Sequence, residues 1–283
     1  MSDTSTATAS STTDQTSTGR AAAPDRATTV ARAAELQRLH ADPELLVVVN
    51  VWDVITATTV AATPGTRALA TASHSIAAAA GYPDGEVIPV EEMLAAVGRI
   101  AAAVDLPVSA DLEAGYGDAG STVSRAIDLG VVGANLEDQM GPLDEAVAAV
   151  RAAVAAGEAA GVEFALNART DAFLKAGDRD PAEVLAEAVQ RGRAYLDAGA
   201  TTFFAPGKLD EAQVSTLVEA LGPQKLNLIS VPGALPLARM QELGVARVSF
   251  GPWSQNVALT ALQQLAEGAY AGGGLPEGTR KLN

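Results

Sequence analysis

The sequence predicts an α/β protein folded as a single (β/α)8 barrel of the TIM type. Three observations point to this fold: the chain has 283 residues, 48% of them are hydrophobic, and short β-type runs alternate with Ala-rich segments of helical spacing from residue 28 onward. Eight such units match the size of a closed barrel, typically about 250 residues. An open, doubly wound sheet is the alternative, but no G-x-G-x-x-G turn follows the first predicted strand.

The predicted strands are eight short runs, each followed by a helical pattern or a loop. In chain order they cover residues 45–50, 68–72, 107–111, 133–137, 163–169, 201–206, 225–230 and 247–251. Helical spacing is clearest at residues 90–104, 120–129, 143–160 and 181–198, and several of these segments end next to a glycine, as helix C-caps do. A last helix is expected over residues 253–271, and Asp53 suits the N-cap of the helix after the first strand.

Residues 1–26 are predicted to be a disordered tail, which leaves residues 27–283 as one catalytic domain. Ser, Thr, Ala and Asp dominate the tail, so it cannot bury enough apolar surface to offset the entropy cost of ordering. A transit peptide is the competing interpretation, and Asp3, Asp14 and the scarcity of Arg argue against it. Because the sequence has neither a secretory signal pattern nor a long apolar run, it predicts a cytoplasmic protein without membrane contact.

The composition restricts the chemistry. A formal net charge of -15 repels phosphate backbones and anionic lipid, so nucleic acid is not an expected partner. A small anionic substrate would therefore need a local positive centre, such as a bound metal ion or an arginine. The chain has no cysteine, which excludes disulfides, thiolate zinc sites and a cysteine nucleophile.

Acidic residues gather where the predicted strands end. Asp111 and Glu113 close the third strand, and the period-2 alternation of a strand predicts that they share a face; Glu137 follows on the fourth strand and Arg169 on the fifth. The carboxyl ends of barrel strands meet at one rim, where adjacent carboxylates repel one another unless a cation lies between them. Oxygen ligands without cysteine favour Mg²⁺, with Mn²⁺ as a second possibility. The alternative is that these acids cap helices or face solvent.

The order and spacing of several short motifs resemble the isocitrate lyase/phosphoenolpyruvate mutase superfamily. The resemblance extends over residues 50–251, which is most of the predicted domain. Each motif is weak alone, and together they are specific: residues 50–53, 72–73, 81–86, 109–117, 135–138, 167–171, 205–207 and 247–252.

The resemblance implies a barrel enzyme with a magnesium site. Asp111 would lie closest to the ion, with Asp84, Glu113 and Glu137 holding it largely through water. Arg169 would bind a substrate carboxylate, for which its planar fork of donors is well shaped. The residues expected to act in catalysis are Asp84, Arg169, His74 and Glu137.

Further residues are expected to contact the substrate. The segment after the second strand would present Ser73, His74 and Ser75, and the remaining positions are Trp52, Gly115, Tyr116 and Asn167. His74 is either a general acid or base or a packed, capping histidine, and the sequence leaves both open. Trp253 is expected to pack against the last helix.

The sequence departs from the superfamily pattern in the loop after the fourth strand. Isocitrate and methylisocitrate lyases carry a Lys-Lys-Cys-Gly-His-type motif there, whereas this chain reads Gln139-Met140-Gly141-Pro142-Leu143. Authentic isocitrate lyase activity is therefore not expected, and carbon–phosphorus chemistry is disfavoured too.

The remaining prediction is a Mg²⁺-dependent lyase or decarboxylase acting on a small, oxaloacetate-like 2-oxo or 2-hydroxy (di)carboxylic acid through a pyruvate enolate. The alternatives are a phosphoenolpyruvate or phosphonopyruvate mutase or hydrolase, and a catalytically weak barrel that binds carboxylates. The resemblance further implies a homodimer or homotetramer that exchanges its last helix.

Overall fold

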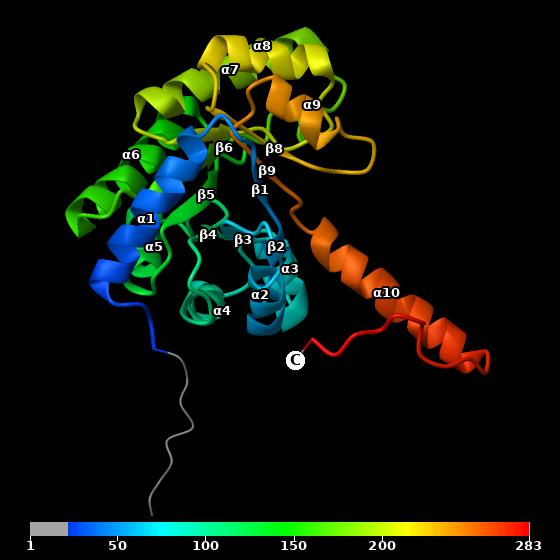
Figure 1. Ribbon diagram of the computed structural model, residues 1–283. Coiled ribbons are helices and arrows are strands. Elements are labelled where there is room, and N and C mark those ends of the chain that lie inside the picture. Colours follow the sequence, from blue (N-terminus) through cyan, green and yellow to red (C-terminus); the bar gives the residue numbers. More distant parts are fainter. Residues whose placement is uncertain (1–21, 283) are drawn as a thin grey trace, which may run out of the picture.

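A parallel sheet closes into a barrel in the computed structural model, which describes residues 22–282. β1 (Leu46–Val48) and β2 (Asn50–Val51) are two parts of one strand interrupted at Val49. β1 pairs with β9 (Arg247–Ser249) and β2 pairs with β3 (Leu69–Thr71), so both edges of the sheet belong to the same strand (Figure 1). The predicted (β/α)8 barrel is confirmed.

Every predicted strand run contains an observed strand. The others are β4 (Val108–Asp111), β5 (Gly133–Glu137), β6 (Ala165–Arg169), β7 (Thr202–Phe204) and β8 (Leu226–Ile229). β5 has the predicted bounds, and the first strand ends at Val51, one residue later than predicted. The other strands are shorter because their outer residues turn into loops. Asp111 pairs with Asn135 and Asn135 with Asn167, so the carboxyl ends of β4, β5 and β6 lie side by side at one rim.

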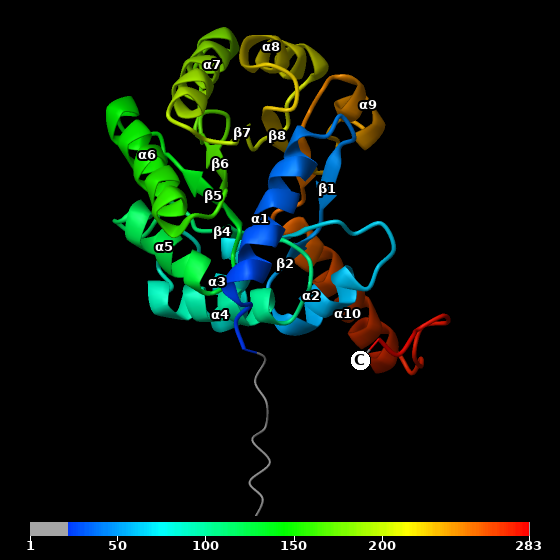
Figure 2. The ribbon, with the colours of Figure 1, turned by 60° about the vertical axis from the view of Figure 1, so that its left-hand side comes forward.

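Helices surround the barrel between successive strands (Figure 2). The N-cap predicted at Asp53 is confirmed, because its carboxylate accepts the Thr56 backbone N–H at 2.8 Å within a capping box. The helices that follow the strands, up to the last one, are α2 (Val54–Ala61), α3 (Ser73–Ala80), α4 (Val90–Ala102), α5 (Ala119–Asp128), α6 (Leu143–Ala160), α7 (Pro181–Asp197), α8 (Glu211–Leu221) and α9 (Leu237–Glu242).

α1 (Arg26–Ala41) covers the end of the barrel where the strands begin. Its Gln37 amide donates to the Glu163 carbonyl at 3.2 Å and to the Thr201 hydroxyl at 3.0 Å, which precede β6 and β7. Leu36 packs on Gly133, the first residue of β5. One end of the barrel is therefore closed, and α1 begins at the predicted domain boundary; residues 1–21 of the predicted tail lie outside the described residues.

α10 (Trp253–Tyr270) leaves the barrel and extends away from it (Figures 1 and 2). Large apolar side chains on this helix are exposed, with Val257 70%, Leu262 61% and Leu259 53% accessible. None of the helices within residues 22–282 is both long and apolar enough to cross a membrane.

Candidate active site

A cavity of about 280 Å³ lies at the carboxyl ends of the barrel strands. This is the end at which barrel enzymes place their chemistry. Its walls combine acids, one arginine and a set of apolar side chains: Asn50, Ala72, Ser73, His74, Asp84, Asp111, Asn135, Arg169, Leu174, Phe204, Pro206, Gly207, Ile229, Val231, Ser249, Gly251, Pro252 and Trp253. Two larger hollows also combine acids with arginine, but one lies beside α1 and the residues before β4, and the other lies between α3 and α4 on the outside of the barrel.

Asp111 ends β4 on the cavity wall with one carboxylate oxygen satisfied and one free. Its Oδ2 accepts the Ser73 backbone N–H at 3.1 Å and the Ser73 hydroxyl at 2.8 Å, and its own N–H donates to Thr71 Oγ1 at 2.9 Å. Its Oδ1 is buried and has no hydrogen-bond partner among the described residues. Because a buried unpaired carboxylate oxygen is costly, this atom is suited to a cation or to a donor on a ligand.

Arg169 ends β6 between two carboxylates. Its Nη1 lies 2.7 Å from Glu137 Oε2, while Nη2 and Nε both lie 2.8 Å from Asp171 Oδ1. Burial works against its charge, but Glu137, Asp111 and Asp171 outweigh that effect and raise the pKa of the guanidinium. Arg169 is therefore a fixed positive charge at the cavity.

Glu137, at the end of β5, has an unusually high pKa for a carboxyl group. Burial raises its pKa to about 7, with further upward contributions from Asp111 and Asp171 and an opposing one from Arg169. Near neutral pH both of its protonation states are accessible. Glu137 does not itself line the cavity, but it contacts Arg169, which does.

Glu113 does not line the cavity. Its carboxylate accepts the Glu86 backbone N–H and the Tyr116 hydroxyl, the latter at 3.1 Å, and burial raises its pKa. Its φ of 52° is left-handed, so the strand alternation that would align it with Asp111 ends at Asp111. Gly115 has a φ of 93°, and a side chain there would collide with Ala119, so these residues shape a turn behind the wall.

His74 and Asp84 form a pair at the mouth of the cavity. His74 Nδ1 lies 3.3 Å from Asp84 Oδ2, and both side chains are about half exposed. Ser73, His74, Asp84, Asp111 and Arg169 are thus the predicted site residues that the structure brings together on one wall.

The other predicted contact residues lie outside this wall. Asn167 is buried inside the barrel, where it donates to Asn135 Oδ1 at 2.7 Å and accepts from Thr202 and Asn227, so it supports Asn135 from behind. Ser75, in the first turn of α3, is fully buried. Trp52 borders a neighbouring hollow beside the C-terminal segment.

The prediction for Trp253 was wrong, because this residue belongs to the cavity wall. It was expected to pack against the last helix, but it lines the cavity and is 40% exposed. The reason is that α10 starts at Trp253 and leaves the barrel, so this side chain stays at the rim instead of being covered by the helix.

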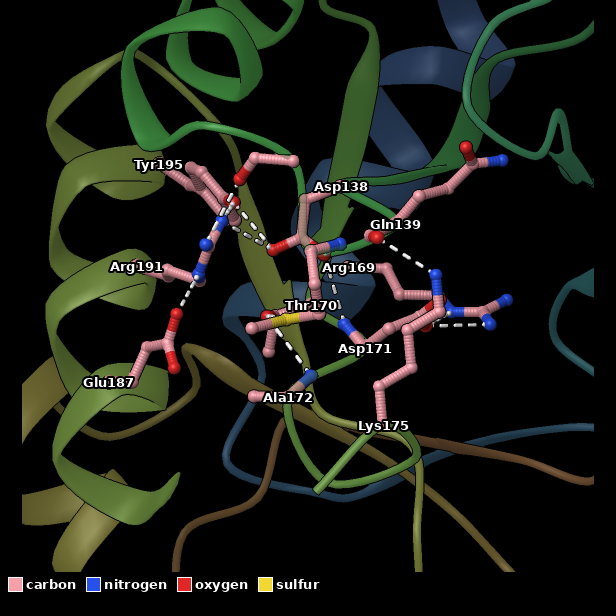
Figure 3. A network of polar contacts seen from close by, with 12 residues as sticks. Asp138, Gln139, Arg169, Thr170, Asp171, Ala172, Lys175, Glu187, Arg191 and Tyr195 are labelled. Atoms are coloured by element: carbon pink, nitrogen blue, oxygen red, sulfur yellow. Dashed lines mark hydrogen bonds and ion pairs between the residues drawn. The ribbon is translucent and has the colours of Figure 1, made fainter. Parts of the chain in front are cut away.

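A buried polar network holds the loop after β5, and sequence reasoning did not predict it (Figure 3). The Asp138 side chain accepts the Tyr195 hydroxyl at 2.7 Å, Arg191 Nη1 at 3.2 Å, and the backbone N–H groups of Met140 and Asp171 at 2.9 and 3.1 Å. Arg191 and Tyr195 come from one face of α7.

The same loop has an unusual backbone. Gln139 and Met140 both have left-handed φ angles, 47° and 60°, and Lys175 Nζ donates to the Gln139 carbonyl at 2.8 Å (Figure 3). Such strained residues persist only where surrounding contacts hold them. These contacts therefore hold the loop at the position where the Cys-containing motif of isocitrate and methylisocitrate lyases was expected by resemblance.

The acids fit a divalent cation held largely through water. Within residues 22–282, no three His, Asp or Glu side chains gather into a ready-made metal cage. Mg²⁺ does not require one, because it retains several waters and commonly binds one or two carboxylates. Asp111 Oδ1 supplies a free buried oxygen, and Asp84 lies on the same wall.

Comparison with known proteins gives consistent similarities. The model of the phosphoenolpyruvate phosphomutase family matches residues 36–270. The chain is 29% identical to 2-methylisocitrate lyase of Escherichia coli, over 67% of each chain. It is 39% identical to the structure of a putative phosphonomutase from Burkholderia cenocepacia, with a TM-score of 0.78, over 83% of this chain and 99% of the other. The structure of oxaloacetate acetylhydrolase with oxalate is 28% identical, with a TM-score of 0.78, over 88% and 91%.

Proposed function

Because the chain belongs to the phosphoenolpyruvate mutase/isocitrate lyase superfamily, we propose that it is a Mg²⁺-dependent carbon–carbon lyase or decarboxylase acting on a small 2-oxo or 2-hydroxy acid. Mn²⁺ is the natural substitute for Mg²⁺ with such oxygen ligands. The observation that carries the proposal is the unpaired Asp111 Oδ1 on the same cavity wall as Arg169. Relatives named for 2-methylisocitrate and oxaloacetate support a small carboxylate substrate.

Arg169 binds the acid end of the substrate. A guanidinium has five N–H donors, and three N···O contacts to Glu137 and Asp171 leave two for a carboxylate in the cavity. The two acids also fix the orientation of the fork, which reduces the entropy lost on binding. Ser73 holds Asp111 in a similar way by donating twice to Oδ2.

Decarboxylation of oxaloacetate is the simplest reaction for this arrangement. The C3–C4 bond breaks, C4 leaves as carbon dioxide, and the bond's electron pair becomes the C2=C3 double bond of pyruvate enolate. A divalent cation, when bound, would supply positive charge for the enolate oxygen. His74, at the mouth and paired with Asp84, is placed to give C3 the proton that completes pyruvate.

The test is pyruvate formation from oxaloacetate in Mg²⁺ and in EDTA, after subtraction of the rate with metal alone. Asp111→Ala and Asp111→Asn should each lower kcat/KM at least about 100-fold, by the loss of a charge aimed at the reacting group. Glu163→Ala, an exposed acid at the other end of the barrel, is the matched control and should match the wild type. Equal rates in wild type and both Asp111 variants would exclude the proposal.

Carbon–phosphorus chemistry is a second candidate, favoured by the 39% identity to the putative phosphonomutase. Phosphate release from phosphonopyruvate or phosphoenolpyruvate, or interconversion of the two, would identify it. Mg²⁺-dependent binding of carboxylates without turnover of any substrate would instead identify a binding protein.

The exposed α10 supports a proposal about assembly. A (β/α)8 barrel normally packs a helix on its outer surface after each strand, but α10 projects away from its own barrel. We propose that a second copy of this chain covers the apolar face of α10, which includes Val257 and Leu262, in a homodimer or homotetramer.

A further inference from the structure

The cavity wall is divided into two sectors by the order of the strands. The ends of β3 to β6 contribute the polar sector, with Ser73, Asp111, Asn135 and Arg169, and the His74–Asp84 pair belongs to the same side. The ends of β7 to β9 contribute a second sector made largely of apolar side chains. We call this sector the apolar wall; its members are Phe204, Pro206, Ile229, Val231, Pro252 and Trp253.

The polar atoms near the apolar wall offer few free hydrogen-bond donors to an anion. Asn50 Oδ1 accepts the backbone N–H groups of Phe250 and Gly251, both at 2.8 Å, and its Nδ2 donates to the Thr71 carbonyl at 2.8 Å. Both polar atoms of the Asn50 side chain are thus already used in hydrogen bonds within the protein. Ser249, which is buried, adds one hydroxyl.

Cations are missing from the apolar wall. Among the described residues that line the cavity, Arg169 is the single arginine or lysine, and it lies in the polar sector between Glu137 and Asp171. Two lysines of neighbouring loops have other neighbours: Lys175 Nζ donates to the Gln139 carbonyl and Lys208 Nζ lies beside Gly233. A second carboxylate placed against the apolar wall would therefore lose water without gaining a partner.

We propose that the substrate is a 2-oxo or 2-hydroxy acid that carries an alkyl group, and that this group packs against the apolar wall. The inference rests on the proposed function, in which Arg169 and Asp111 hold the acid end in the polar sector. It adds that Phe204, Ile229 and Trp253 determine specificity by selecting a hydrocarbon substituent over a carboxylate at that position.

The expected selectivity follows from apolar burial. Each methylene that moves from water onto the wall should tighten binding about 4-fold, which corresponds to the usual transfer free energy of one CH₂ group. The gain should stop when the cavity of about 280 Å³ is full. A terminal carboxylate of the same length should reverse the gain, because it would be desolvated without a cation.

The experiment measures binding of unreactive 2-oxo acids to the full chain in Mg²⁺ by titration calorimetry. Pyruvate, 2-oxobutanoate and 2-oxopentanoate form a series in which one methylene is added at a time. 2-Oxoglutarate is the matched probe, since it is 2-oxopentanoate with a carboxylate in place of the terminal methyl group. We expect Kd to fall about 4-fold at each step, and 2-oxoglutarate to bind at least about 10-fold more weakly than 2-oxopentanoate.

Variants test whether the wall causes this order. Ile229→Lys should bring the affinities for 2-oxoglutarate and 2-oxopentanoate together or reverse them, and Ile229→Ala should reduce the gain per methylene. Val87→Lys, an exposed site outside the cavity, is the control for an added charge and should keep the wild-type order.

The outcomes separate this inference from the proposed function. A rising affinity along the series in a protein that does not turn over oxaloacetate would support the apolar wall and reject the decarboxylase. Turnover of oxaloacetate with equal or tighter binding of 2-oxoglutarate would reject the apolar wall and retain the enzyme. Failure of every acid to bind would overturn both.

Discussion

Tyr195→Phe is the most direct test of the network that fixes the loop after β5. Tyr195 is fully buried in α7, and its hydroxyl donates to Asp138 Oδ2 at 2.7 Å while lying 3.3 Å from Arg191 Nη1 (Figure 3). The substitution removes one oxygen atom and leaves the ring in place. It therefore deletes a hydrogen bond to a buried carboxylate with little change in packing.

The expected size follows from these contacts. A hydrogen bond to a charged group contributes about 1.5–3 kcal/mol to stability. Asp138 would keep its contacts with Arg191 and with the N–H groups of Met140 and Asp171, so its charge would not become unpaired. Tyr195→Phe should therefore lower the free energy of unfolding by about 2 kcal/mol, whereas removal of the charge in Asp138→Ala should cost about 3–5 kcal/mol.

Tyr82→Phe is the matched control. The Tyr82 hydroxyl also donates to a carboxylate, Glu92 Oε1, at 2.9 Å, but this pair lies at the surface, where water replaces a lost partner. Unfolding in guanidinium chloride, with identical slopes for the three proteins, gives the comparison. The reasoning would be refuted if Tyr195→Phe were as stable as wild type, or if the two Tyr→Phe variants lost the same amount.

Three further predictions concern buried titratable groups and the last helix. Burial lowers the pKa of His40 to about 3, against about 6.5 in the unfolded chain. A fall from about pH 6.5 to about 4.5 should therefore cost the wild type about 2 kcal/mol of unfolding free energy, and His40→Leu should lack this loss in denaturant titrations at each pH. For Glu137 the sign is reversed, because burial raises its pKa to about 7: in EDTA, raising the pH from about 4.5 to about 7 should destabilise the wild type relative to Glu137→Gln by on the order of 2–3 kcal/mol. Leu262→Glu should reduce the molar mass measured by light scattering to that of one chain. Gln264→Glu adds the same charge elsewhere on α10 and should leave the molar mass of the assembly unchanged. An unchanged molar mass for Leu262→Glu would contradict the proposed assembly.

The sequence predicted the barrel and part of the site because both depend on local patterns. Alternating strand and helix periodicity defines the barrel, and polar residues at strand ends are brought to one rim by the parallel register. Asp111 and Arg169 are the last residues of β4 and β6, so the register alone places them. Glu113 lies two residues beyond Asp111, where the chain has left the strand, and the alternation rule no longer applies to it.

Two parts of the site could not be read from local patterns. The Asp138 network joins residues more than fifty positions apart, and its geometry depends on how α7 packs beside the loop after β5. Phe204 and Ile229 look like ordinary core residues of buried strands, and their position on the cavity wall follows from where β7 and β8 end. Trp253 joins the same wall because α10 leaves the barrel.

The fixed loop after β5 bears on where the proton chemistry can occur. A mobile loop can carry a reactive side chain to the substrate, but residues 139–143 contain no cysteine, lysine or histidine, and Asp138, Arg191 and Tyr195 hold the loop from below. In the proposed reaction, the proton would then come from groups already near the cavity, of which His74 at the mouth and Glu137 behind Arg169 are the candidates. Glu137 is in contact with Arg169, so protonating Glu137 also removes a negative charge beside the guanidinium that is proposed to bind the substrate. His74 has no such conflict, and His74→Gln should therefore lower kcat for pyruvate formation with little change in KM, whereas Glu137→Gln should change both.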